Sequence, residues 1–368
     1  MRYRRLPIEI ESPEERGYGN IRHNLTESSV RDLRFADLGL ELDDLVLAYG
    51  DHRGDPRLRE LIAAQAHVAL HDVMCTPGAS GALFIVATSL LEAGDHLVVE
   101  RTNYSTNIET PRLIGAEASF LDLDFDQGYR LDVDRLRSLV RPGETRLISV
   151  TVPHNPTGVS FDLDTLHALI EIAESTGAHL LVDETYRELS HGEPLPVAAS
   201  LSNRAISVCS LSKAYGLPGI RLGWVATRDV ELSETLLAAK EQILITGSAL
   251  DEAVAAAVLE RRDQFLEPIR AAALEHFGIV VDWMAGQELL EWVEPDGGVV
   301  CFPRLVDSVD PDTFYRELNE AGTFVGEGHW FDTDRQHFRL GYAWPTTAEL
   351  REGLLAITSA AQRASTGG

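Results

Sequence analysis

Helical and strand-like stretches alternate along the middle of the sequence, and this alternation limits the possible folds more than any other feature. Short apolar stretches typical of buried strands lie at residues 96–100, 146–150, 179–183, 205–209 and 221–226. Helices are predicted at residues 79–91 and at about residues 164–175. Strands that alternate with helices favour a parallel sheet, because each helix returns the chain to the starting edge. We therefore predict an α/β fold with a mainly parallel central sheet and helices on both faces.

The pattern changes towards both ends of the chain, which predicts three parts. Residues 1–44 show little periodicity and are expected to form an N-terminal arm and a segment of a small domain. Residues 45–265 are assigned to a large domain, and residues 266–368 to a small C-terminal α+β domain. Few helix breakers occur in residues 233–284, so long helices should cross between the two domains. The last helix should begin at Thr346-Thr-Ala-Glu349, a capping-box pattern.

Charge and composition exclude several classes of protein. A formal net charge of −26 would repel nucleic acids and anionic membranes, so neither is expected as a partner. Residues 1–10 have no signal-peptide core, and no apolar run reaches the roughly 18 residues of a membrane helix. Cys75, Cys209 and Cys301 are odd in number and widely spaced, which suggests neither disulfides nor a metal site. We expect a cytoplasmic protein without a bound metal.

Four polar clusters lie near predicted strand ends or helix starts. They are Gly78-Ala-Ser80, His154-Asn-Pro-Thr-Gly158, Asp183-Glu-Thr-Tyr186 and Ser210-Leu-Ser-Lys213. Ligands of open parallel sheets bind beyond the carboxyl ends of the strands. One crevice is therefore expected to collect all four clusters.

Lys213 is unusual because it follows an apolar strand directly and precedes a glycine-rich turn. Lysines normally lie on solvated faces. Ser210, Ser212 and Arg221 lie close to it in the sequence and offer two hydroxyls and a guanidinium. A guanidinium suits phosphate because its planar donors match the phosphate oxygens. This segment therefore predicts a phosphate-binding site beside a functional lysine.

The segment Ser-Leu-Ser-Lys-Ala-Tyr-Gly-Leu-Pro-Gly-Ile-Arg-Leu-Gly-Trp, residues 210–224, resembles the cofactor-lysine motif of the class I/II aminotransferases. These are fold-type I enzymes that use pyridoxal 5′-phosphate (PLP). The segments 154–158 and 182–186 resemble two further motifs of that family, in the same order and at similar spacing. Residues 78–81 match its phosphate loop, and the similarity runs from about residue 45 to about residue 360.

The resemblance implies a role for each matching residue. Lys213 would hold PLP as a Schiff base, and Asp183 would keep the pyridine nitrogen protonated. Asn155 and Tyr186 would bond the cofactor's phenolic oxygen. Lys213, Asp183 and Tyr186 are thus the expected catalytic residues. The remaining cofactor contacts are expected from Ala79, Ser80, Ser210, Ser212 and Arg221 at the phosphate, and from Tyr104 stacked on the ring.

Two further residues match family positions outside the four clusters. Tyr49 resembles the tyrosine that reaches the phosphate of the neighbouring subunit, which implies a homodimer with shared active sites. Arg339 matches the arginine that binds the α-carboxylate of the amino-acid substrate.

The sequence departs from the family pattern at three places. Thr102 stands where a proline is usual before Tyr104, Glu327-Gly-His-Trp330 replaces a Pro-Gly loop, and Asn24–Ser29 replaces a glycine-containing segment. All three lie on the substrate side. The sequence therefore supports PLP chemistry more firmly than it supports simple amino-group exchange.

Three functions follow from these observations. The first is an aminotransferase that acts on an amino acid. The second is a PLP-dependent lyase, decarboxylase or cyclase of a natural-product pathway, since the Lys213 motif also resembles that of capreomycidine synthase, which uses PLP for ring closure. The third is a non-catalytic binding protein or regulator. That third function is disfavoured because Lys213 and Asp183 are both present and only about 40 residues precede the main domain.

Overall fold

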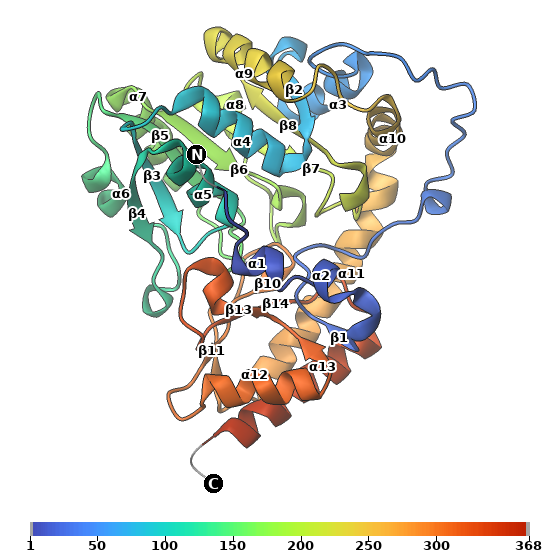
Figure 1. Cartoon of the computed structure of the whole chain (residues 1–368), viewed down its shortest axis with the longest axis vertical. Helices are drawn as coiled ribbons and strands as arrows, with labels where there is room; N and C mark the ends of the chain where they lie inside the picture. Colours follow the sequence, from blue (N-terminus) through green and yellow to red (C-terminus); the bar gives the residue numbers. More distant parts are fainter. Residues whose placement is uncertain (1–2, 366–368) are drawn as a thin grey trace.

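A seven-stranded sheet organises the upper half of the computed structural model, which describes residues 3–365 (Figure 1). Its strands, in spatial order, are β2 (Val73–Pro77), β8 (Leu222–Thr227), β7 (Ala205–Ser210), β6 (His179–Asp183), β5 (Thr145–Thr151), β3 (His96–Arg101) and β4 (Glu117–Asp122). Only β8 runs antiparallel to its neighbours. The predicted α/β fold with a mainly parallel sheet is confirmed.

Two details of the predicted sheet were wrong. Strands β2 and β4 were not predicted, and β8 begins one residue later than expected. Arg221 itself lies just before β8 in the left-handed region, at φ 46°. Because of this left-handed backbone conformation, Arg221 does not take part in the strand pairing of β8.

Helices cover both faces of the sheet. One face carries α4 (Gly78–Leu90), α5 (Ser105–Ile114) and α9 (Val230–Ile243). The other carries α6 (Val133–Leu139), α7 (Leu163–Thr176), α8 (Ala198–Leu201), α3 (Pro56–Ala66) and α10 (Ala249–Glu260). Along β6, Leu180 and Val182 pack on the α7 face and Leu181 packs on the α4 face. Burial on both faces explains why the strands are continuous apolar runs.

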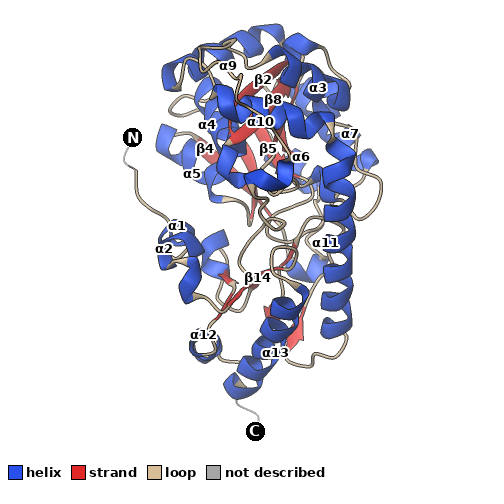
Figure 2. Cartoon of the chain, turned by 90° about the vertical axis from the view of Figure 1, so that its right-hand side faces the viewer, coloured by secondary structure: helices blue, strands red, loops and turns tan. Residues whose placement is uncertain are grey.

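The lower half is built around α11 (Arg262–Met284), which runs down from beneath the sheet along one side of the molecule (Figure 2). It holds the helices α12 (Pro311–Glu320) and α13 (Thr347–Ala364) and a small antiparallel sheet, β10 (Val300–Cys301), β14 (Phe338–Gly341) and β13 (Gly326–Glu327). A second small sheet pairs β9 (Leu290–Glu291) with β11 (Arg304–Leu305). The predicted capping box is confirmed: Glu349 N donates to the Thr346 hydroxyl at 3.3 Å, and Thr346 N donates to the Glu349 carboxylate at 2.7 Å.

The N-terminal arm forms part of this lower half. Its short helices are α1 (Pro7–Ile10) and α2 (Pro13–Arg16), and its strand β1 (His23–Asn24) pairs in parallel with β12 (Thr323–Phe324). Glu11 fastens the arm by accepting a hydrogen bond from the Trp330 indole at 2.6 Å. The boundaries predicted after residues 44 and 265 stay predictions.

Short 3₁₀ helices complete the chain. They are η1 (Tyr18–Asn20), η2 (Phe35–Leu38), η3 (Leu70–Asp72), η4 (Phe125–Gln127), η5 (Arg187–Leu189), η6 (Pro218–Ile220) and η7 (Gly328–Phe331). Between residues 3 and 365, none of the helices combines the length and apolar character needed to cross a bilayer.

Candidate active site

A pocket of about 480 Å³ opens between the carboxyl edge of the sheet and the N-terminal arm. It collects all four predicted polar clusters. The predicted residues that line it are Ala79, Ser80, Tyr104, Asn155, Asp183, Tyr186, Ser210, Ser212, Lys213, Arg221 and Arg339. Tyr49 is the one predicted site residue that does not line it.

The sheet topology explains this convergence. Asp183 is the last residue of β6 and Ser210 is the last residue of β7, so both lie at the carboxyl edge. Because β8 runs antiparallel to β7, Arg221 at its start reaches the same edge. Strand β2 is parallel to β7, and α4 begins directly after it, which brings the helix N-terminus there too.

The start of α4 and Arg221 together form a site suited to an anion. Arg221 donates to the Ser212 hydroxyl at 3.4 Å. A Cβ on Gly78 would lie 2.6 Å from the guanidinium, and one on Gly223 would lie 2.7 Å from the Ala79 nitrogen. Glycines therefore let the arginine and β8 approach the helix N-terminus. Free amides, hydroxyls and a guanidinium in one place fit a phosphate group.

Asp183 provides a buried carboxylate beside this anion site. Its side chain is 7% exposed and accepts hydrogen bonds from the Thr185 nitrogen at 3.0 Å and the Thr185 hydroxyl at 2.6 Å. Burial raises the pKa of Asp183, whereas these bonds and the charge of Lys213 lower it. Among residues 3–365 the carboxylate has no ion-pair partner, so a cationic ring nitrogen of a ligand fits beside it.

Lys213 is the only lysine in the pocket, and the chain contains one other, Lys240. Lys213 Nζ donates to the Ser28 hydroxyl at 3.2 Å, whereas Lys240 is buried elsewhere and donates to the His52 carbonyl. Burial lowers the pKa of Lys213. A larger share of its amine is therefore neutral near pH 7, as a nucleophile or a general base requires.

Arg339 closes the pocket from the lower half. It is 5% exposed and donates to the Asn155 side chain at 3.0 Å and to the Thr26 carbonyl at 2.8 Å. Its Nε has no partner among the described residues. A buried donor without a partner is costly, so this nitrogen is suited to a ligand carboxylate.

The N-terminal arm contributes residues that the sequence did not predict as site residues. Thr26, Glu27 and Ser28 line the pocket, and the Tyr186 hydroxyl donates to the Ser28 carbonyl at 2.9 Å. The three departures from the family pattern could have indicated these residues. The three segments lie close together, because Trp330 also lines the pocket and the Thr102 hydroxyl donates to the adjacent Phe331 carbonyl.

Tyr49 lies on the surface, 86% exposed, in the long loop between η2 and α3. This position is open to another copy of the chain. Its predicted contact with a neighbouring subunit stays a prediction.

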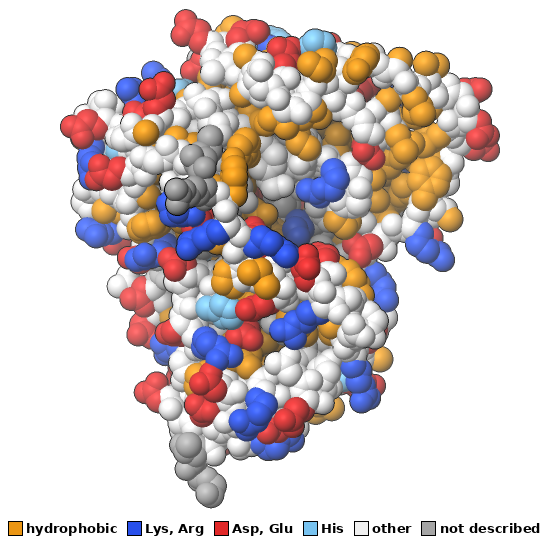
Figure 3. All heavy atoms as spheres, in the orientation of Figure 1, with side chains coloured by type: hydrophobic (Ala, Val, Ile, Leu, Met, Phe, Trp, Pro, Cys, Tyr) orange, Lys and Arg blue, Asp and Glu red, His pale blue; other side chains and the backbone are white. Residues whose placement is uncertain are grey.

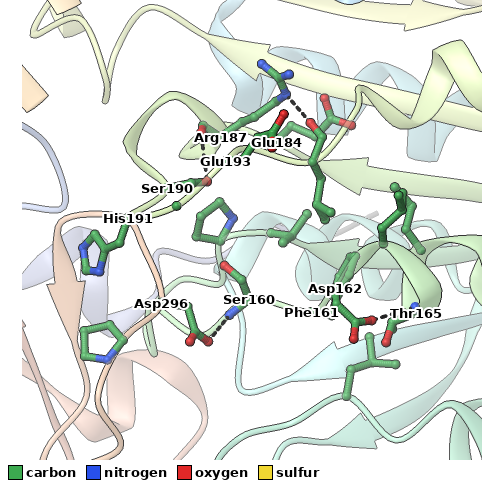
Figure 4. A pocket seen from close by; sticks show the side chains of 18 of the residues that line it. Ser160, Phe161, Asp162, Thr165, Glu184, Arg187, Ser190, His191, Glu193 and Asp296 are labelled. Atoms are coloured by element: carbon green, nitrogen blue, oxygen red, sulfur yellow. Dashed lines mark hydrogen bonds between the residues drawn. The ribbon is translucent and has the colours of Figure 1, made fainter. Parts of the chain in front are cut away.

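A larger cavity, about 890 Å³, lies on the α7 side of the sheet (Figure 4). Several of its polar groups are already engaged: Asp296 accepts from the Ser160 nitrogen at 2.9 Å, and Asp162 accepts from the Thr165 nitrogen at 2.8 Å (Figure 4). Arg187 donates to the Leu195 carbonyl at 2.8 Å. The smaller pocket is the better candidate, because it holds the lysine and the arginine with an unpaired donor.

Comparison with known proteins agrees with this geometry. The sequence pattern described as aminotransferase class I and II matches residues 24–357. The chain belongs to this family. Its PLP-dependent fold accounts for the pocket, whose anion site, buried carboxylate and lysine fit the cofactor.

Two relatives of this chain have different names, one a synthase and the other a transaminase. Capreomycidine synthase from Streptomyces vinaceus is 35% identical over 343 residues, covering 91% of this chain and 87% of that protein. An arginine–pyruvate transaminase from Pseudomonas aeruginosa is 29% identical over 308 residues, covering 80% and 77%.

Solved structures give the same picture. A PLP-dependent aminotransferase from Streptococcus suis superposes with a TM-score of 0.91 at 28% identity and covers 100% of both chains. The PLP-dependent cyclase OrfR superposes with a TM-score of 0.88 at 28% identity, covering 99% of this chain and 98% of that one. This family member therefore resembles both transaminating and ring-closing enzymes.

Proposed function

We propose that this PLP-dependent enzyme is an aminotransferase that acts on an amino acid, with the cofactor linked covalently to Lys213. The observation that carries the proposal is the meeting of Lys213, Asp183 and Arg339 in one pocket. In that order, they suit the cofactor's aldehyde, the cofactor's ring nitrogen and the substrate's α-carboxylate. When bound, PLP supplies an electron sink that makes a bond to the substrate's α-carbon breakable.

The proposal gives the remaining residues the task of holding the cofactor. Ala79, Ser80, Ser210, Ser212 and Arg221 line the pocket and would bind its phosphate, and Tyr104, in the same lining, would stack on its ring. Asp183 keeps the ring nitrogen protonated. Asn155 and Tyr186 bond the phenolic oxygen, for which the Tyr186 hydroxyl must turn from the Ser28 carbonyl.

Lys213 and Arg339 act on the amino acid. Arg339 fixes the α-carboxylate and thereby the orientation of the bonds at the α-carbon. The neutral Nζ of Lys213 would take the proton from the substrate's α-carbon as a general base, hold it, and then donate it as a general acid. Its lowered pKa favours the first step.

The second candidate is a lyase, decarboxylase or cyclase, and the comparisons favour the cyclase. Capreomycidine synthase and OrfR cover most of this chain, and the departures from the family pattern surround the substrate side of the pocket. A cyclase uses the same cofactor site. A non-catalytic binding protein is disfavoured by the retained Lys213 and Asp183.

We also infer a cytoplasmic homodimer. Val46, Leu47 and Tyr49 are strongly exposed in the loop before α3. Hydrophobic side chains gather on this side of the upper half (Figure 3). A second copy would cover them and bring Tyr49 to its neighbour's phosphate site. The three cysteines are free thiols, as in a reducing compartment.

The reaction type is tested by incubating the purified holoenzyme with a panel of amino acids, with and without a keto acid. Keto acid, carbon dioxide, eliminated fragments and ring-closed products are quantified separately. Transamination predicts a keto acid from the donor and loss of the cofactor's visible absorbance with the amino acid alone. A ring-closed product without net amino transfer would replace this proposal by the cyclase.

A further inference from the structure

The substrate side of the active-site pocket carries carboxylates from the N-terminal arm. Glu9, Glu14 and Glu27 all line it. The cationic residues in the described part of this lining are Lys213, Arg221, which is assigned to the phosphate, and Arg339, which is assigned to the α-carboxylate. The arm therefore makes one wall of the pocket negative.

Two of these carboxylates have free bonding capacity. Glu27 is half-buried, and one of its oxygens accepts from the Tyr18 hydroxyl at 2.9 Å and from the Asn24 amide at 3.4 Å. Within residues 3–365, its other oxygen has no hydrogen bond and Glu14 has neither a hydrogen bond nor an ion pair. Glu9, by contrast, accepts from the Leu6 nitrogen at the rim.

Glu14 and Glu27 are close enough to act on the reactive groups. Their charges raise the pKa of both Lys213 and Arg339, against the larger effect of burial. Arg339 is itself nine-tenths buried with an unpaired Nε, which marks where the ligand must place an anion. Among the described residues, the pocket therefore presents an unpaired donor and two carboxylates without an ion-pair partner to the same ligand.

The charges do not balance if the ligand is PLP and a neutral amino acid. The phosphate faces Arg221, the protonated ring nitrogen faces Asp183, and the α-carboxylate faces Arg339. The α-amino group takes the place of Lys213. The half-buried Glu27 and the exposed Glu14 are then left without a counter-charge, and a carboxylate that is partly withdrawn from water is stabilised by a nearby cation.

We infer that the substrate carries a second positive charge on its side chain, bound by Glu27 and Glu14. A guanidinium or an ammonium group would meet this requirement, and Ile8 and Leu83 in the same lining offer apolar contact to its methylene stem. This inference rests on the proposed function, because it takes the amino acid and its carboxylate anchor as given.

The test compares cationic amino acids with neutral ones of similar shape on the holoenzyme. Arginine is paired with citrulline and lysine with norleucine, so the two pairs distinguish a guanidinium from an ammonium. Apparent Kd is read from the first rapid change in visible absorbance after mixing, before the slower loss of absorbance that amino transfer would cause. We expect one cationic member to bind at least about tenfold tighter than its neutral partner.

Glu27→Gln and Glu14→Gln should each reduce that ratio, and the double variant should bring it close to one. Glu14 lies on the exposed side of α2, so its replacement should leave the fold intact. Glu171→Gln removes one charge from an exposed site on α7 and should keep the ratio, which controls for the overall negative charge.

Two outcomes would overturn the inference alone: equal Kd within both pairs, or a ratio that the double variant leaves unchanged. A holoenzyme whose absorbance no amino acid alters would instead overturn the proposed function, and this inference with it.

Discussion

Arg339 and Asn155 hold each other across the pocket: the guanidinium donates to the amide oxygen at 3.0 Å. The bond joins β14 in the lower half to the loop after β5. It fixes the planar guanidinium so that its free Nε can meet a ligand.

Replacing Arg339 by lysine should therefore impair substrate binding although it keeps the charge. Charged hydrogen bonds contribute about 1.5–3 kcal/mol each, so kcat/KM for the amino acid should fall about tenfold or more. The corresponding amine, which has no carboxylate, should be little affected. Arg351→Lys, at an exposed position of α13, is the control. Equal slowing of amine and amino acid would exclude Arg339 as the carboxylate site.

Asp183→Asn should keep the cofactor but lose most of the rate. The amide has nearly the same shape and can still accept from Thr185, whereas it cannot hold a proton on the ring nitrogen. We expect kcat to fall by at least about 100-fold. Cofactor content by absorbance and kcat are measured on the same preparation. Asp164→Asn, at an exposed site on α7, should change neither quantity. Near-normal turnover in Asp183→Asn would rule out the ring-nitrogen role.

The surface position of Tyr49 predicts that each active site needs two chains. Tyr49→Phe should weaken cofactor retention by about 1 kcal/mol, the contribution of an ordinary hydrogen bond. Mixing Tyr49→Phe with Lys213→Ala chains should restore one wild-type site per mixed dimer, because the intact lysine then faces an intact tyrosine. Cofactor retention after dialysis reports the recovery. A monomer in light scattering at working concentration would contradict this arrangement.

Glu100 should make the stability of the protein depend on pH. It is 2% exposed, accepts from the Thr151 nitrogen at 2.8 Å and lies 3.9 Å from His154 Nε2. Burial raises the pKa of Glu100 to about 8 and lowers that of His154 to about 4, so the histidine is neutral near pH 7. A carboxyl whose folded pKa is raised stabilises the fold fully below its unfolded pKa, and loses that contribution as pH rises.

The free energy of unfolding of the wild type should therefore fall, relative to Glu100→Gln, between about pH 4.5 and 8. The difference should be on the order of a few kcal/mol. Urea denaturation at several pH values measures it, with Glu171→Gln as the surface control. Parallel curves for wild type and Glu100→Gln would show that Glu100 does not titrate in this range.

The cofactor side of the pocket was predictable because its residues lie at the ends of strands that can be recognised in the sequence. Asp183 and Ser210 end apolar strands, and the ends of parallel strands lie at the same edge of a sheet regardless of the fold of the remaining chain. On the substrate side Arg339 was predicted, but Ser28 and Glu27 were not, since they reach the pocket only through pairing of the two-residue strand β1 with β12. Strand β4 was not predicted because it lies at the edge of the sheet, where most of its side chains are only half-buried and its sequence is not a continuous apolar run.

The central claim is that Lys213 holds the cofactor, and borohydride reduction tests it most directly. The chain has only two lysines, and Lys240 is fully buried away from the pocket, so peptide mass spectrometry can separate the alternatives. We expect the reduced wild-type holoenzyme to carry the cofactor's mass on the peptide that contains Lys213. Lys213→Ala should carry none and should be inactive. A reduced adduct on Lys240, or one that persists in Lys213→Ala, would contradict the account.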